Sequence, residues 1–131
     1  MKIEFLSVDD ILRIHQDQVT RYGGSTSIPD LNLLLSATAM PQATFSGAYL
    51  HQDLFEMAAA YLFHLVQDHP FIDGNKRTGL VAALMFLTLN GVEIAANNRT
   101  LVDFVFRVAQ GQEDKSSIAH FFRQHQKHAS R

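Results

Sequence analysis

No cysteine occurs among the 131 residues, which excludes disulfide bonds and metal sites built from thiolates. No stretch approaches 18 uninterrupted apolar residues, so we expect no segment that spans a bilayer. The formal net charge is only −2, so no overall positive field attracts nucleic acid or an anionic membrane. The sequence starts without the apolar core of a signal peptide. These absences predict a cytoplasmic protein that binds neither nucleic acid nor membranes directly.

Hydrophobic residues, in contrast, are abundant: they make up 47% of the sequence, with ten Phe among them. A chain of this length buries roughly two thirds of the surface that its unfolded form exposes, so it needs no covalent or metal staple. We find no repeat, linker or low-complexity stretch. The sequence therefore predicts one domain over residues 1–131.

Apolar residues recur at helical spacing along most of the chain, which predicts an all-α fold, a bundle of about six helices. The helices expected from Asp53 and from Lys76 are apolar almost all round, which is typical of buried central helices. Ser7 and Asn98 are expected to cap two of the others. The expected helices cover residues 8–22, 30–41, 53–69, 76–90 and 98–110, and a final amphipathic helix contains residues 118–122.

Residues 43–50 differ from their surroundings, because aromatic and β-compatible residues flank a Ser-Gly pair. This pattern predicts a short β-hairpin, or flap, rather than a helix. The flap residues are Thr44, Phe45, Ser46, Gly47 and Tyr49.

The most informative segment runs from His69 to Arg77, between the two most apolar helices, and reads HPFIDGNKR. Polar groups are costly to bury unless something pairs with them, and an anion would serve as that partner. The N-terminus of the helix from Lys76 offers unpaired backbone N–H groups and the positive end of the helix dipole. Gly74 lets the backbone approach a ligand closely, and Lys76 and Arg77 add charge-assisted donors.

Two residues of this segment predict more than anion binding. Asp73 would repel a phosphate unless a cation lay between them, and Mg²⁺ prefers one or two carboxylates together with phosphate oxygens. Asp73 is therefore a predicted magnesium ligand. His69 is of the residue type that can accept a proton from an attacking hydroxyl near neutral pH. Phe71 and Ile72 are expected to anchor the loop to the core.

This segment resembles the signature of the Fic/Doc family, H-x-F-x-[D/E]-[G/A]-N-[G/K]-R. The resemblance covers nearly the whole chain, including the helix end at Arg21–Gly24 and the flap, and it implies a Fic/Doc-like helical bundle with a hairpin flap. It also implies that the flap is a target-docking hairpin, to which a substrate segment can add as an extra strand.

The resemblance implies a role for each motif residue. His69 would be the general base, and Asp73 would bind Mg²⁺. Asn75, Lys76 and Arg77 would hold the phosphates of ATP, together with the backbone of Gly74 and Asn75. The implied catalytic residues are His69, Asp73, Asn75, Lys76 and Arg77.

Two positions favour the Doc branch of the family. Lys76 stands where Fic adenylyltransferases typically have Gly, and Leu80 stands where they have a second Arg. The Doc branch implies a toxin that transfers the γ-phosphate of ATP to a threonine of elongation factor Tu and so arrests translation. Gly74, where some Doc proteins have Ala, leaves transfer of AMP as an alternative. A catalytically silent binding module is a third reading, which the complete motif disfavours.

The resemblance also predicts a partner. The family's inhibitory helix carries a Ser/Thr-x-x-x-Glu-Gly/Asn motif, and no Ser or Thr of this sequence is followed four positions later by Glu. We therefore expect inhibition in trans by a Phd-like antitoxin, whose segment would fold into a groove beside the flap. The histidines outside the motif are expected to be structural or solvated.

Overall fold

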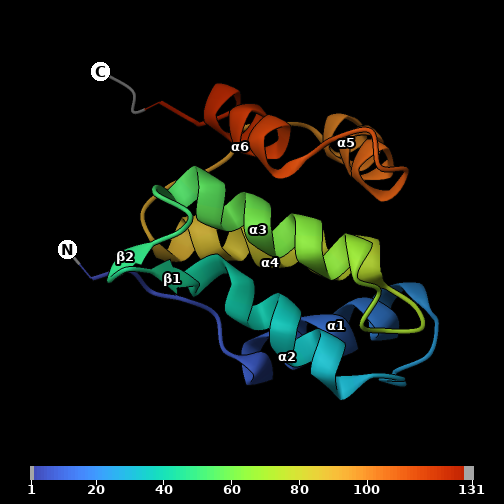
Figure 1. The fold of residues 1–131 in the computed structure, drawn as a ribbon. Coiled ribbons are helices and arrows are strands. Elements are labelled where there is room, and N and C mark those ends of the chain that lie inside the picture. Colours follow the sequence, from blue (N-terminus) through green and yellow to red (C-terminus); the bar gives the residue numbers. More distant parts are fainter. Residues whose placement is uncertain (1, 129–131) are drawn as a thin grey trace.

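The computed structural model describes residues 2–128, in which six α-helices surround one hydrophobic core and a two-stranded hairpin lies at one end (Figure 1). This confirms the predicted helical bundle. The elements are α1 (Val8–Tyr22), α2 (Leu31–Ala39), a 3₁₀ turn η1 (Met40–Gln42), β1 (Thr44–Phe45), β2 (Ala48–Tyr49), α3 (Leu54–Gln67), α4 (Asn75–Leu89), α5 (Asn98–Ala109) and α6 (Lys115–Gln124). No helix within the described residues is long and apolar enough to cross a membrane.

Five of the six α-helices begin at a side-chain cap, which satisfies a backbone N–H of the first turn. Ser7 and Asp10 form a reciprocal capping box at α1. The cap of α5 is Asn97 rather than the predicted Asn98, because the Asn97 side chain accepts from the N–H of Thr100. The caps of α2, α3 and α6 are Asp30, Asp53 and Asp114.

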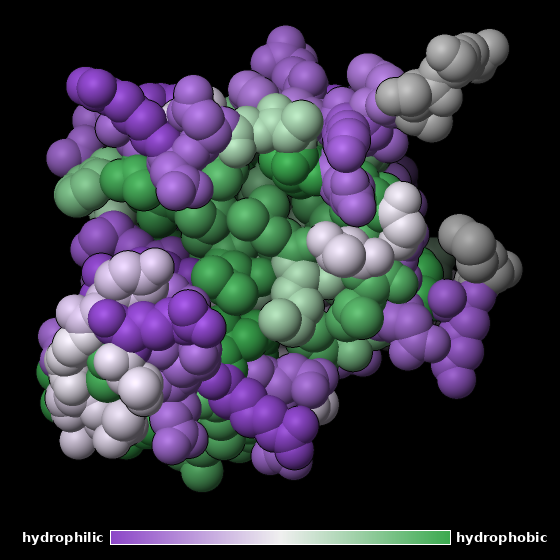
Figure 2. All heavy atoms as spheres, turned by 180° about the vertical axis from the view of Figure 1, so that it is seen from behind, coloured by the Kyte–Doolittle hydropathy of each residue, from purple (hydrophilic) through white to green (hydrophobic). Residues whose placement is uncertain are grey.

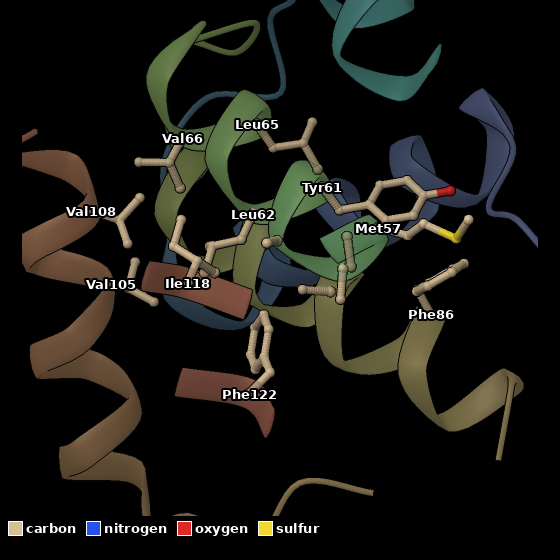
Figure 3. Close-up of a cluster of buried hydrophobic side chains, with 14 of the residues drawn as sticks. Met57, Tyr61, Leu62, Leu65, Val66, Phe86, Val105, Val108, Ile118 and Phe122 are labelled. Carbon is tan, nitrogen blue, oxygen red and sulfur yellow. The ribbon is translucent and has the colours of Figure 1, made fainter. Parts of the chain in front are cut away.

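Helices α3 and α4 are the centre of the bundle, as their apolar sequences predict. Figure 3 shows Leu62 and Val66 of α3 facing α5 and α6. Gly79 of α4 permits the close approach of α3: a β-carbon built there would lie 3.0 Å from Val66 Cγ2 and 3.3 Å from the Leu62 carbonyl oxygen. The loop between α3 and α4 connects these two closely packed helices, so the packing of the core holds both of its ends in place.

The predicted hairpin is present, with Thr44 paired to Tyr49 around a two-residue turn. Both turn residues have positive φ, 51° at Ser46 and 82° at Gly47, as hairpin turns of this length favour. The Tyr49 ring lies 5.6 Å from that of Phe5, which in turn contacts Phe86 near the C-terminal end of α4. The hairpin thus lies at the N-terminal end of α3, opposite the loop that follows α3 (Figure 1).

Candidate active site

The loop between α3 and α4 contains the segment that the sequence singled out. α3 ends where Pro70 disfavours a helical conformation at the preceding residue. That residue, His69, is exposed and has a φ of 49°, a left-handed conformation that costs an L-residue roughly 1–2 kcal/mol. The fold therefore holds an accessible imidazole in a strained backbone, as functional sites often do.

The Asn75 side chain stabilises this loop through two hydrogen bonds to the backbone of Phe71. It is buried, accepts a hydrogen bond from the N–H of Phe71 at 3.0 Å and donates one to the Phe71 carbonyl at 2.8 Å. Phe71 itself is in the core, as expected, whereas Ile72 is exposed. The Asn75 amide is thus occupied in closing the turn, and its contact with phosphate stays a prediction.

α4 is the one α-helix of the described chain whose N-terminus has no side-chain cap. Its capping residue is Gly74, which has a φ of 82° and no side chain to offer. The N–H groups of the first turn therefore point outward at the positive end of the helix dipole. Such a helix start is suited to binding an anion.

Two exposed cations stand at this helix start. The Lys76 Nζ lies 5.6 Å from the centre of the Phe106 ring, and the Arg77 guanidinium carbon lies 4.8 Å from that of Tyr22. Neither cation has a carboxylate partner among residues 2–128. Since cations at a helix N-terminus oppose the dipole, this arrangement lacks a counterion that an anionic ligand would supply.

Asp73 is held from outside the motif. Its Oδ2 accepts a hydrogen bond of 2.7 Å from the N–H of Ser25, while Oδ1 accepts none in the described structure. No group of three or more potential metal ligands occurs in residues 2–128. A single carboxylate with one unused oxygen beside a helix start suited to an anion fits Mg²⁺, which completes its shell with water and phosphate oxygens.

An apolar groove opens from the Lys76 side of the site. It lies between α1, α4 and α5 and has a cavity volume of about 500 Å³. In Figure 2 the apolar residues form a hollowed band with hydrophilic borders on the face seen from behind. The lining residues are Gln18, Tyr22, Lys76, Arg77, Leu80, Val81, Leu84, Asn98, Leu101, Val102, Val105 and Phe106. No hairpin residue is among them, so this groove is not the one expected beside the flap.

The structure brings the motif residues together but not the predicted flap. Residues Thr44 to Tyr49 lie at the other end of α3, and a 14-residue helix is about 21 Å long. The segment that does contact the motif loop is the one after α1, where Ser27 accepts a hydrogen bond from the N–H of Ile72. The docking role of the flap stays a prediction, and docking there would occur away from His69.

Sequence reasoning misses three residues that support the loop: His15, Gly24 and Ser25. The sequence predicts a structural or solvated His15, and the structure buries it against the motif with its Nε2 2.8 Å from the Asp73 carbonyl oxygen. The one signal in the sequence is the Gly pair that ends α1. Spacing along the chain could not reveal these contacts, because 48 and 58 residues separate Ser25 and His15 from Asp73.

A second polar cluster lies outside the motif. The Lys115 Nζ is 3.1 Å from Nε2 of His64 and 3.4 Å from Nε2 of His51. Burial, and secondly the charge of Lys115, lower the pKa of both histidines below the ordinary value of 6.5. Both imidazoles are therefore neutral near pH 7 and accept from Lys115, so this cluster joins α6 to α3 and to the segment before it.

The structure is thus a helical bundle that presents an exposed histidine, a carboxylate and an uncapped helix start suited to an anion. Comparison with known proteins identifies the family. Residues 5–87 match the model of the Fic/DOC family. The chain is 40% identical over 118 residues to "Toxin Doc" of Mycolicibacterium smegmatis, which covers 88% of each chain. It is 33% identical over 114 residues to "Protein kinase doc" of Escherichia phage P1, which covers 87% of this chain and 89% of that one. The chain belongs to the Fic/Doc family.

Proposed function

We propose that this protein is a Doc-type toxin, a phosphotransferase that moves the γ-phosphate of ATP to a threonine hydroxyl of a protein target. The observation that carries this proposal is the uncapped start of α4, whose first turn carries two exposed cations without a carboxylate partner among residues 2–128, in the loop that also exposes His69. The names of the two relatives, a Doc toxin and a protein kinase, support the same assignment. The resemblance of the motif makes elongation factor Tu the proposed target, and arrest of translation the proposed effect.

The chemistry assigned to these residues is simple. His69 accepts the proton of the threonine hydroxyl while the hydroxyl oxygen bonds to the γ-phosphorus. The bond from that phosphorus to the β–γ bridging oxygen breaks, and ADP leaves. The N–H groups of α4, with Lys76 and Arg77, stabilise the charge on the phosphate oxygens. Such positioning and electrostatic stabilisation supply most of the catalysis in phosphoryl transfer.

Asp73 would hold Mg²⁺ through its unused oxygen. When bound, the ion would neutralise phosphate charge beside a carboxylate that otherwise repels it. The bond from Ser25 fixes the other carboxylate oxygen, so the orientation of Asp73 does not depend on the ion.

Two positions favour transfer of phosphate over transfer of AMP. The Lys76 side chain occupies the helix start where Gly would leave the backbone open, and Leu80 provides no donor. A nucleotide bound as in Fic adenylyltransferases would lose phosphate contacts worth about 1.5–3 kcal/mol each. If ATP instead binds with its terminal phosphate toward His69, the N–H groups of α4, Lys76 and Arg77 can still contact its phosphates.

The test is a labelling experiment. The protein is incubated with Mg²⁺, a bacterial lysate and ATP labelled at either the α- or the γ-phosphate, and the proteins are separated. Label from γ-ATP alone, which disappears with His69→Ala, is expected. Label from α-ATP, or an added AMP in the intact mass of a target, would replace the proposal by adenylylation.

We further propose that a separate antitoxin chain inhibits this protein in the cell, because one of its relatives is named "Toxin Doc". The groove between α1, α4 and α5 is the proposed docking site for its helical segment. An amphipathic helix buries its apolar side in such a groove, and here it would also cover Lys76. Expression of the wild-type chain alone should arrest bacterial growth, and His69→Ala should relieve the arrest. If bacteria that express an active wild-type chain without an antitoxin grow normally, the protein is not a toxin.

A further inference from the structure

His15 lies in α1, far from the motif in sequence, and is buried to all but 2% of its surface. Its imidazole stacks on the Phe71 ring, with centroids 3.6 Å apart and planes within 7°. Its other neighbour is Gly74, where an added β-carbon would stand 3.4 Å from His15 Cδ2. The imidazole therefore fills the space under the turn that leads from Phe71 into α4.

The polar edge of this imidazole has one defined partner. Nε2 lies 2.8 Å from the main-chain carbonyl oxygen of Asp73. A carbonyl oxygen can only accept, so Nε2 carries a proton and donates it. An apolar side chain of similar size would fill the same space without providing this donor.

Asp73 is consequently held at two points. The donor from His15 fixes its peptide, and the N–H of Ser25 fixes its carboxylate at 2.7 Å. The peptide that His15 holds is the one that joins Asp73 to Gly74, the cap of α4. The hydrogen bond from His15 therefore helps to fix both the direction of the Asp73 carboxylate and the orientation of the first N–H groups of α4.

We propose that His15 is a positioning residue for the phosphate-transfer site. It acts through Asp73 and Gly74 and touches no substrate. This inference rests on the proposed function for its effect on nucleotide binding, but its effect on the motif loop is independent of any activity.

Three substitutions separate the hydrogen bond from the packing. His15→Phe keeps an aromatic ring against Phe71 and loses the donor. His15→Gln places an amide N–H₂ near the position of Nε2 and loses the ring. His15→Met, a flexible apolar side chain without a donor, replaces the Phe variant if that variant does not fold. His120→Gln, on the exposed side of α6, is the matched control.

Two readouts are measured on the full chain. The first is hydrogen exchange of the amides of residues 72–75 against those of α3. The second is the Mg²⁺ concentration that gives half-maximal binding of ATP, which is expected to respond about tenfold to the loss of a group that orients a metal ligand. The donor-free variants should exchange about tenfold faster at residues 72–75 and need about tenfold more Mg²⁺, with α3 unchanged. His15→Gln should recover most of both effects.

The outcomes are distinct. Wild-type exchange and wild-type Mg²⁺ dependence in the donor-free variants would overturn the proposal. A Gln variant as impaired as the Phe variant would also overturn it, because returning the donor alone would then not restore the loop. If the wild-type chain binds no ATP with Mg²⁺, the proposed function fails, and the exchange data alone decide whether His15 holds the loop.

Discussion

Gly24 lies directly against Asp73: a β-carbon built on Gly24 would stand 2.8 Å from the β-carbon of Asp73. The φ of Gly24 is 116°, a conformation that residues with a side chain rarely adopt. The segment after α1 can therefore reach Asp73, the proposed magnesium ligand, only because this position has no side chain. The same close approach lets the neighbouring Ser25 donate to the carboxylate.

We predict that Gly24→Ala displaces Asp73 and impairs Mg²⁺-dependent ATP binding by at least tenfold. Backbone strain at such a position also costs about 1–3 kcal/mol of unfolding free energy. Gly23→Ala is the matched control, because Gly23 also has positive φ, 87°, but a β-carbon added there would meet no atom within 4 Å. Both variants should lose stability in urea denaturation, but only Gly24→Ala should lose ATP binding. Equal binding in the two variants would contradict the role of this contact.

We predict that two substitutions of His69 have the same effect on transfer activity but different effects on the free energy of unfolding. His69→Ala and His69→Gly should each lower transfer about 10²–10⁴-fold, because each removes the proposed general base. His69→Gly should nevertheless be about 0.5–1 kcal/mol more stable than His69→Ala, because glycine accepts the positive φ without strain. Urea denaturation of both variants checks this order. An Ala variant at least as stable as the Gly variant would show that the backbone relaxes once the imidazole is removed.

We predict that the groove, and not the hairpin, carries the antitoxin. Val102→Glu places a charge at a half-exposed position of the groove wall and should weaken antitoxin binding at least tenfold, while transfer to the target persists. Leu89→Glu, at an exposed apolar position of α4 outside the groove lining, is the control and should bind normally. Calorimetric titration with a partner antitoxin measures both. A Phe45→Glu variant in the hairpin that loses antitoxin binding instead would refute this placement.

We predict that the free energy of unfolding falls as the pH drops through about 6.5. Burial and Lys115 lower the pKa of His51 and His64 in the folded state, so the unfolded chain takes up protons first and is favoured by acid. Glu56 and Asp68 also face these histidines and oppose the shift. The stability contribution is therefore complete above pH 6.5 and is lost below it.

Lys115→Met tests the cause. The loss of stability between pH 7.5 and 5.5, measured as the urea midpoint, should become smaller but remain, because burial is the larger cause. Lys127→Met, which removes an exposed lysine paired with Glu93, should leave the pH dependence unchanged. An unchanged pH dependence in the Lys115 variant would show that its charge does not reach the histidines.

The sequence is informative wherever the determinants are local. Helical periodicity and the caps predict the bounds of the first five helices to within about two residues, with the cap of α5 at Asn97 instead of Asn98, and the Ser-Gly pair predicts the hairpin turn. The motif itself is readable because its nine residues are contiguous. The contacts of Gly24 and His15 with Asp73 are not predictable, since they depend on how α1 packs against α4. The position of the hairpin relative to His69 escapes prediction for the same reason, because it depends on the direction in which α3 runs through the bundle.

The separation of the hairpin from His69 sets a minimum size for any target that engages both. The two regions lie at opposite ends of α3, and about 21 Å of helix corresponds to six or seven residues of fully extended peptide. A short peptide that contains only the proposed acceptor threonine and its nearest neighbours could occupy one region but would not reach the other. Selection through both ends would therefore require a target segment long enough to span this distance, whether extended or folded, and a shorter peptide would escape such selection.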